Sequence, residues 1–283
     1  MRRSSVIVAG LFAGLLTLLA AVPASAAGCL NYFTDFDSQQ ADLYYEVYQD
    51  GVHEAGTVCD TDACATFGVQ GGRTYGKFTV NPSDNPGFYQ NTATSQVAIG
   101  QPDTVGNTGP ISVSYGHPVT LEAKIKWSSN YTATGGTAVG TSGLILWNGA
   151  VTDTGETPDY DQIGFTWASP NVIGGLLTGF TAGSVVDLNP VGINYPSPTL
   201  DINSWFKVKM VWSQDASGVQ SVAYFVEGTY IGTDVLPAQL SGLSLEIWND
   251  NQEPVFCDTG LCESFPNPSA PQSFYVDYVK ITG

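Results

Sequence analysis

The chain has 283 residues, of which 12% are charged and 43% hydrophobic, and its formal net charge at pH 7 is −17. Residues 27–283 contain seven basic and 26 acidic side chains, which gives this part of the chain a net charge of −19. A surface of this charge repels phosphate backbones and anionic lipids, so we expect no nucleic acid and no membrane surface as a partner. Uncharged polysaccharides and calcium ions are compatible with it.

Residues 1–26 have the features of an export signal peptide. Arg2 and Arg3 precede an apolar run over residues 6–21, and small residues follow at 24–26. We expect cleavage near residue 27, a secreted extracellular protein, and no membrane span, because the apolar run is short. The alternative is a lipid anchor at Cys29, which follows an imperfect lipobox. The length of residues 27–283 is typical of one domain, and we expect the protein to be a monomer.

The cysteines occur mainly in two matching segments, CDTDAC at 59–64 and CDTGLC at 257–262. In an oxidising compartment this spacing favours two small disulfide-closed loops. Pairing between the two segments is a second arrangement. A zinc site is a third, although the chain has only two histidines, His53 and His117. Cys29 is left over.

Turn-forming residues recur every few positions, and no stretch keeps an apolar period of 3.6 residues, so we expect little helix. Alternating apolar and polar residues predict strands instead, most clearly where Glu122, Lys124 and Lys126 alternate with apolar residues. The predicted strands cover 119–127, 144–147, 162–167, 205–212, 219–226, 243–249 and 274–281. Their spacing predicts an all-β, two-sheet antiparallel β-sandwich, with long loops at 88–116 and 189–199.

Two segments carry a resemblance to a known superfamily. WFKVKMVWSQDASGVQSVAYFVEGTYIGT, at 205–233, resembles the paired hairpins of laminin G-like and concanavalin A-like domains. FYVDYVKITG, at 274–283, resembles the closing strand of laminarinase- and lichenase-type glycoside hydrolases. The resemblance implies a jelly roll of the concanavalin A-like lectin/glucanase superfamily and no organic cofactor. It also implies a structural Ca²⁺ site formed by Asp277 with Asp35 and Asp37 near the start of the domain. The alternative is that Asp277 is a polar residue on the solvent face of an edge strand.

Candidate catalytic residues follow from the same resemblance. Laminarinase-type enzymes carry both catalytic carboxylates on one strand, in an E-x-D-x-E pattern, and the nearest match here is 246–250, EIWND. A period of two places Glu246, Trp248 and Asp250 on one strand face. Trp therefore replaces the central Asp, and Asp replaces the second Glu. The candidate substrate contacts are Trp248 and Asn249 on this strand, together with Gln162 and Trp167.

A second acidic group, Asp159 and Asp161, precedes the strand at 162–167. Asp161 is therefore another candidate acid or base, although an Asp-rich turn after Pro158 explains the same residues. Two functions remain open, and the first is favoured over the second. One is a glycoside hydrolase that cleaves an extracellular polysaccharide in a jelly-roll cleft. The alternative is a non-catalytic lectin-like or adhesion module that binds a polysaccharide or oligosaccharide on the same concave face.

Overall fold

The computed structural model describes residues 30–38, 43–49, 52–55, 63–82, 94–99, 111–147, 151–152, 155–156, 161–172, 178–186, 189–257 and 260–283. Only the backbone is described for 43–49, 52–55, 94–99, 151–152, 155–156, 254–257 and 260–263. These ranges contain strands and turns but no α-helix. Within them, no helix has the length and apolar character needed to cross a membrane. The predicted signal peptide and Cys29 lie outside the described residues, as does Asp159.

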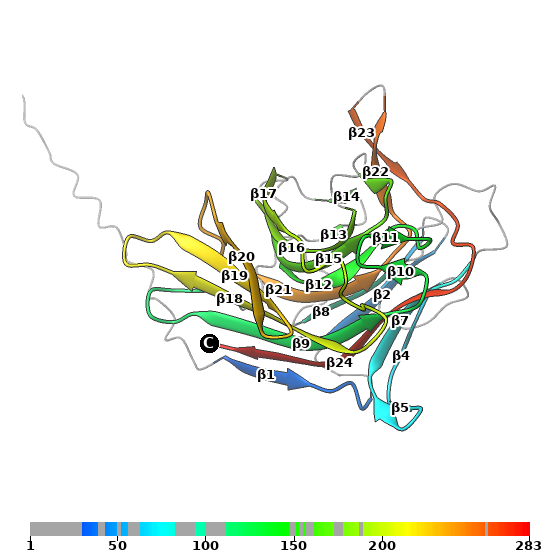
Figure 1. Ribbon diagram of the computed structural model, residues 1–283, viewed down its shortest axis with the longest axis horizontal. Helices are drawn as coiled ribbons and strands as arrows, with labels where there is room; N and C mark the ends of the chain where they lie inside the picture. The colour runs from blue at the N-terminus through cyan, green and yellow to red at the C-terminus, as the bar shows by residue number, and fades with distance from the viewer. Residues whose placement is uncertain are drawn as a thin grey trace, which may run out of the picture.

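Two antiparallel sheets of eight strands each form stacked layers (Figure 1). The order of the first sheet is β20 (Thr229–Val235), β19 (Gln220–Val226), β18 (Phe206–Gln214), β9 (Val119–Trp127), β24 (Gln272–Thr282), β7 (Gly76–Val80) and β4 (Ala63–Thr66), and β1 (Asn31–Thr34) also pairs with β24. The order of the second sheet is β17 (Asn189–Asn194), β16 (Gly179–Val186), β15 (Gln162–Ala168), β12 (Thr141–Trp147), β21 (Ser244–Asn249), β8 (Thr94–Ile99), β2 (Leu43–Gln49) and β3 (Val52–Ala55).

Four short hairpins complete the described strands. They are β5 (Val69–Gln70) with β6 (Arg73–Thr74), β10 (Tyr131–Thr132) with β11 (Gly135–Gly136), β13 (Val151–Thr152) with β14 (Gly155–Glu156), and β22 (Glu253–Cys257) with β23 (Gly260–Ser264). The hairpins β13–β14 and β22–β23 lie on the side of the second sheet that faces away from the first (Figure 1).

The seven predicted strands are all present, with ends that differ from the prediction by at most three residues. β9 shows why the alternation was informative. Its residues alternate strictly between buried and partly exposed positions, because one face packs on the core and the other faces solvent. The two-sheet antiparallel sandwich predicted from the sequence is confirmed.

Both predicted long loops contain a strand, so these two predictions were wrong. Within 88–116, β8 pairs with β21 on one side and with β2 on the other. Within 189–199, β17 pairs with β16 at the edge of the second sheet. Pro190 is tolerated there because an edge strand has neighbours on only one side.

Trp127 connects the two sheets inside the core. Its indole Nε1 donates a 2.6 Å hydrogen bond to Ser142 Oγ on β12 of the second sheet. Its ring centroid lies 4.7 Å from that of Phe274 in the first sheet and 5.2 Å from that of Phe180 in the second. One side chain therefore supplies apolar area and a satisfied polar contact to both layers.

A buried carboxylate joins the edge strands of the two sheets. Asp234 of β20 accepts 2.9 Å hydrogen bonds from Ser184 Oγ on β16 and from Asn194 Nδ2 on β17. Gly192 of β17 lies against this carboxylate, and a Cβ atom there would overlap the oxygen atoms of Asp234. Glycine is therefore required at this position for the two sheets to meet at this edge.

The replacement Trp127→Phe is expected to lower the free energy of unfolding by about 1 to 3 kcal/mol, because it removes the inter-sheet hydrogen bond and part of the ring packing. Urea denaturation monitored by circular dichroism measures this change. Trp205→Phe, at a partly exposed position on the outer face of the first sheet, is the matched control and should cost clearly less. Equal losses for the two variants would contradict the bridging role of Trp127.

Candidate functional site

The register of the second sheet places several candidate residues on its outer face. Ile145 of β12 lies directly opposite Glu246 of β21, and the neighbouring pair is Gly143 with Trp248. Directly opposed residues of an antiparallel pair project from the same face. The residues between them, such as Ile247, belong to the core. Glu246 and Trp248 therefore share the face that points away from the first sheet.

An apolar cluster lies on this outer face, separate from the main core. It consists of Ile145, Trp147 and Trp248, all of them buried. The absence of a side chain at Gly143 makes room for it, because a Cβ there would lie 2.8 Å from the Trp248 ring. Glu246, beside this cluster, is only 4% exposed. The strand that carries the predicted catalytic motif is thus covered on both faces.

Asp250 follows β21 and is fixed by hydrogen bonds. Its carboxylate accepts from the Thr141 backbone amide at 2.7 Å, from Thr141 Oγ1 at 3.0 Å and from the Gln252 amide at 3.1 Å. Trp248 Nε1 donates to the same threonine hydroxyl at 2.9 Å. Glu253 lies close by and accepts from the hydroxyl of Ser169. The donors around Asp250 are therefore neutral groups.

Burial determines the protonation of Asp250. The residue is 5% exposed, and loss of solvent raises the pKa of its carboxyl to about 7, although the Thr141 and Gln252 hydrogen bonds oppose this shift. The carboxylate of Glu253 adds a smaller increase to the same pKa. A carboxyl group that titrates near neutrality has a protonation range suited to acid–base chemistry. The same range also occurs in buried structural carboxyls.

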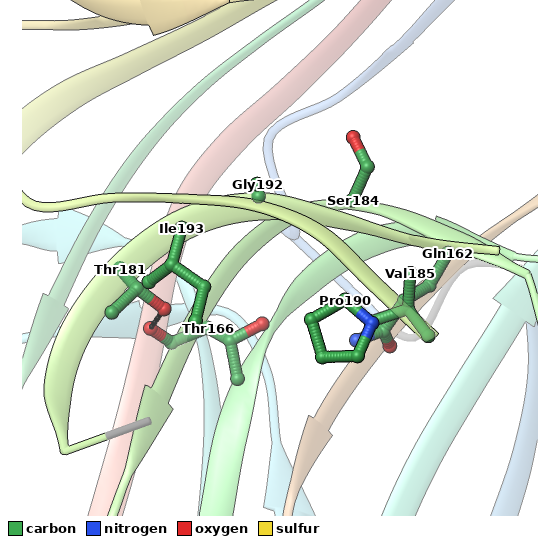
Figure 2. A pocket seen from close by; sticks show the side chains of 9 residues that line it. Gln162, Thr166, Thr181, Ser184, Val185, Pro190, Gly192 and Ile193 are labelled. Atoms are coloured by element: carbon green, nitrogen blue, oxygen red, sulfur yellow. Dashed lines mark hydrogen bonds between the residues drawn. The ribbon is translucent and has the colours of Figure 1, made fainter. Parts of the chain in front are cut away.

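A small, partly open pocket, which we call the groove, lies on the outer face near the β17 edge of the second sheet, where β15, β16 and β17 meet (Figure 2). Neutral side chains line it: Gln162, Thr166, Thr181, Val185, Pro190 and Ile193, together with Gly183, Ser184 and Gly192. The described lining contains no carboxylate. In Figure 2, the hydroxyl of Ser184 points away from the other side chains, towards its bond with Asp234.

The side chains at alternate positions of β15 determine which chemical groups line the groove. Gln162 and Thr166 line it, and Gly164 lies between them in the strand. These are positions i, i+2 and i+4, the spacing of the E-x-D-x-E pattern. Here they carry an amide, no side chain and a hydroxyl. The groove thus provides neutral hydrogen-bonding groups and apolar contacts.

Two predicted substrate contacts were wrong. Trp167 is 0% exposed, and its Nε1 donates to the Thr132 carbonyl at 2.9 Å, so its ring belongs to the core. Asn249 is also 0% exposed, and its amide bonds to backbone and side-chain groups inside the sandwich. Both side chains point inwards because they occupy the alternate positions of β15 and β21 that face the core.

The remaining candidate site residues lie in two separate places in the second sheet. Gln162 lies at the groove, and Asp161, half-buried, immediately precedes β15. Glu246, Trp248 and Asp250 lie together on β21 and just beyond its end, but both carboxylates are buried. Two residues of these sites were not predicted from the sequence: Thr141, which holds Asp250, and Thr166, which lines the groove. Only the regular alternation in the segment QIGFTW would have indicated Thr166.

The predicted calcium ligands do not gather into a coordination sphere. Asp277 Oδ2 lies 3.1 Å from Lys124 Nζ and 3.6 Å from Arg73 Nη1, a cationic environment that does not fit a metal ligand. The carboxylate of Asp35 accepts from the backbone amide of Asp37 at 3.4 Å. Within the described residues, no three His, Cys, Asp or Glu side chains form a group that could hold a metal ion. Ca²⁺ binding stays an untested prediction.

The cysteine pairing stays a prediction as well. Cys64 lies in β4, whereas Cys59 is outside the described residues, and only the backbone is described for Cys257 and Cys262.

Comparisons with known proteins agree on the architecture. No family model and no curated protein matches the chain. The β-glucanase of Bacillus licheniformis is similar, with 14% identity, a TM-score of 0.50, and coverage of 89% of this chain and 98% of that one. A prokaryotic β-1,3-1,4-glucanase (lichenase) from a mouse hindgut metagenome has 12% identity, a TM-score of 0.52 and the same coverage.

A third similar structure is the κ-carrageenase of Pseudoalteromonas carrageenovora in complex with a κ-carrageenan oligosaccharide. It has 15% identity and a TM-score of 0.52, and the match covers 93% of this chain and 98% of that one. At these identities the likeness concerns the fold. The chain has the concanavalin A-like jelly-roll fold that its sequence predicted.

The pKa of Asp250 predicts a pH dependence of stability. Because the folded-state pKa lies above the unfolded value near 3.9, the folded protein binds the additional proton between about pH 4 and pH 7. The contribution of Asp250 to stability is therefore complete below pH 4 and is lost as the pH rises through 7, with a slope of at most about 1.4 kcal/mol per pH unit.

Urea denaturation at several pH values tests this dependence, with wild type and Asp250→Asn compared at each pH. The difference between the two isolates Asp250 from all other carboxyl groups. We expect the Asn variant to lack this loss of stability at rising pH. Parallel curves for the two proteins would show that Asp250 does not titrate in this range.

Proposed function

We propose that this protein binds an extracellular polysaccharide in the groove of β15, β16 and β17 and does not hydrolyse it. One observation carries the proposal. The alternate positions of β15 hold the neutral residues Gln162, Gly164 and Thr166, of which Gln162 and Thr166 line the groove, whereas an E-x-D-x-E strand would place acidic side chains at these positions. Amide and hydroxyl groups can exchange hydrogen bonds with sugar hydroxyls, but they cannot act as the carboxylate pair of a glycosidase.

The glycan class of the ligand is supported by the fold. The similar structures include two β-glucanases and a κ-carrageenase bound to an oligosaccharide. A shared fold does not transfer a reaction, because activity resides in the site. The neutral groove of this chain is compatible with a glycan, so the class of ligand is the one property that we extend from these structures to this chain.

Hydrolysis at β21 is the second candidate, and the pKa of Asp250 favours it. With a pKa of about 7, Asp250 would be partly protonated at neutral pH, as a general acid requires. Glu246 would then be the second carboxylate. The burial of both residues argues against direct access for a polysaccharide chain. This candidate therefore ranks below binding.

Affinity gel electrophoresis against β-glucans, xylans, galactans, carrageenans and chitin tests the proposal, with reducing-end analysis of the same mixtures. We expect retardation by at least one glycan without release of reducing ends. Gln162→Ala and Thr166→Val should each weaken the binding about fivefold, the effect of losing one neutral hydrogen bond. Thr120→Val, a polar position on the outer face of the first sheet, is the matched control and should bind normally.

Two outcomes contradict the proposal. Unchanged binding by both groove variants would remove the groove as the binding site. Release of oligosaccharides that Glu246→Gln and Asp250→Asn both abolish would establish hydrolysis at β21 instead.

A further inference from the structure

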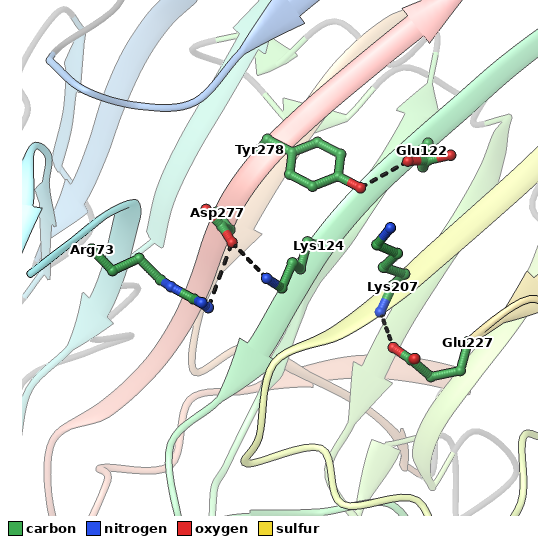
Figure 3. Close-up of polar contacts among 7 residues, drawn as sticks. All are labelled: Arg73, Glu122, Lys124, Lys207, Glu227, Asp277 and Tyr278. Carbon is green, nitrogen blue, oxygen red and sulfur yellow. Dashed lines mark hydrogen bonds and ion pairs between the residues drawn. The ribbon is translucent and has the colours of Figure 1, made fainter.

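The positive charges of this acidic protein gather on one face. Residues 27–283 have seven basic side chains. On β7, β9, β18 and β24, six of them alternate with core residues and so project from the outer face of the first sheet. The seventh, Arg73 of β6, reaches the same face, because its guanidinium contacts Asp277 (Figure 3). The lysines are Lys77, Lys124, Lys126, Lys207, Lys209 and Lys280.

Three aromatic rings form a partly exposed group among these cations. The ring centroid of Tyr75 lies 5.6 Å from those of Trp205 and Tyr275, which are 6.5 Å apart. Lys126 Nζ lies 4.6 Å from the centre of the Tyr275 ring and 5.2 Å from that of Trp205. The guanidinium of Arg73 lies 5.3 Å from the centre of the Trp205 ring. We call these five residues the outer cluster.

The cations are close enough to repel one another. Arg73 and Lys126 both contact the Trp205 ring, and Lys207 lies directly opposite Lys124 in the register of β18 and β9. Like charges in such positions destabilise a sheet. Among the described residues, Asp277 is the carboxylate that forms ion pairs with these seven basic groups, with Arg73 and Lys124 as its partners. Glu122 lies opposite Lys209 and Lys280 in the register, away from the outer cluster. An anionic ligand would relieve the remaining repulsion.

From this arrangement we propose that the outer cluster is a second glycan-binding site, specific for acidic polysaccharides. A sugar ring would stack on Trp205 or Tyr275, and its carboxylate or sulfate group would accept hydrogen bonds from Lys126 and Arg73. The site lies on the opposite side of the sandwich from the groove of β15, β16 and β17. It is therefore independent of the function proposed above.

The charge of the rest of the molecule favours a polysaccharide over a nucleic acid. A duplex carries one charge per about 1.7 Å along its axis, so its remote phosphates would face the acidic remainder of the surface. An acidic polysaccharide carries its charges more sparsely, at most a few per sugar. Because the Debye length is about 8 Å at physiological ionic strength, salt screens a ligand bound at the outer cluster from the acidic rest of the protein surface.

Microscale thermophoresis tests this site by measuring the binding of the intact protein to end-labelled polygalacturonate, dextran sulfate, neutral dextran and duplex DNA. We expect salt-sensitive binding to at least one of the two acidic polymers, and none to dextran. Lys126→Gln and Trp205→Leu should each weaken this binding about fivefold or more. Lys280→Gln is the matched control, because it removes the same charge from the same face, five residues along β24 from Tyr275.

The proposal would be overturned by any of three results. These are no binding to either acidic polymer, equal weakening by Lys280→Gln and Lys126→Gln, and tighter binding of duplex DNA than of both polymers. Unfolding in urea confirms that each variant is folded. Gln162→Ala should bind the acidic polymers normally, so a failure at the groove and a failure at the outer cluster can be told apart.

Discussion

The buried amide of Asn249 fixes the position of the central strand β21, and the features around the candidate site depend on it. Asn249 Nδ2 donates to the carbonyl oxygens of Phe78 and Gln272, each at 3.0 Å, and Oδ1 accepts from the Tyr131 hydroxyl at 2.8 Å. A buried amide left without these partners would cost its full desolvation energy, so the two sheets can pack in this register only. The next residue, Asp250, is thereby held against Thr141.

Strands that bury one face could be located well from the sequence. In β9 and β18 the alternation is visible directly, because each position contacts either core or solvent. It could not reveal β8, which lies in a segment rich in Gln, Thr and Gly and is recognisable only by its neighbours. The burial of Asp250 was equally inaccessible. It depends on Thr141, 109 positions earlier in the chain, and pairings at that distance leave no local pattern.

The same fold can separate recognition from reaction. In this chain, the alternate positions of β15 that line the groove are neutral. Carboxylates accumulate just beyond β21 instead, where Thr141 and Gln252 donate to Asp250, and Ser169 donates to Glu253. The resemblance to glucanases in sequence and fold therefore concerns the architecture, since a sandwich is maintained by its core residues, whereas a reaction depends on a few surface positions.

The position of β24 in the first sheet has a consequence for biogenesis. This strand lies between β9 on one side and β7 and β1 on the other, yet it is the last strand in the sequence. Until residues 272–282 have left the ribosome, the strands that flank them lack their shared hydrogen-bonding partner. Domains that acquire a central strand last cannot fold progressively during synthesis. The first sheet can therefore close only after residues 272–282 are available to pair with β9, β7 and β1.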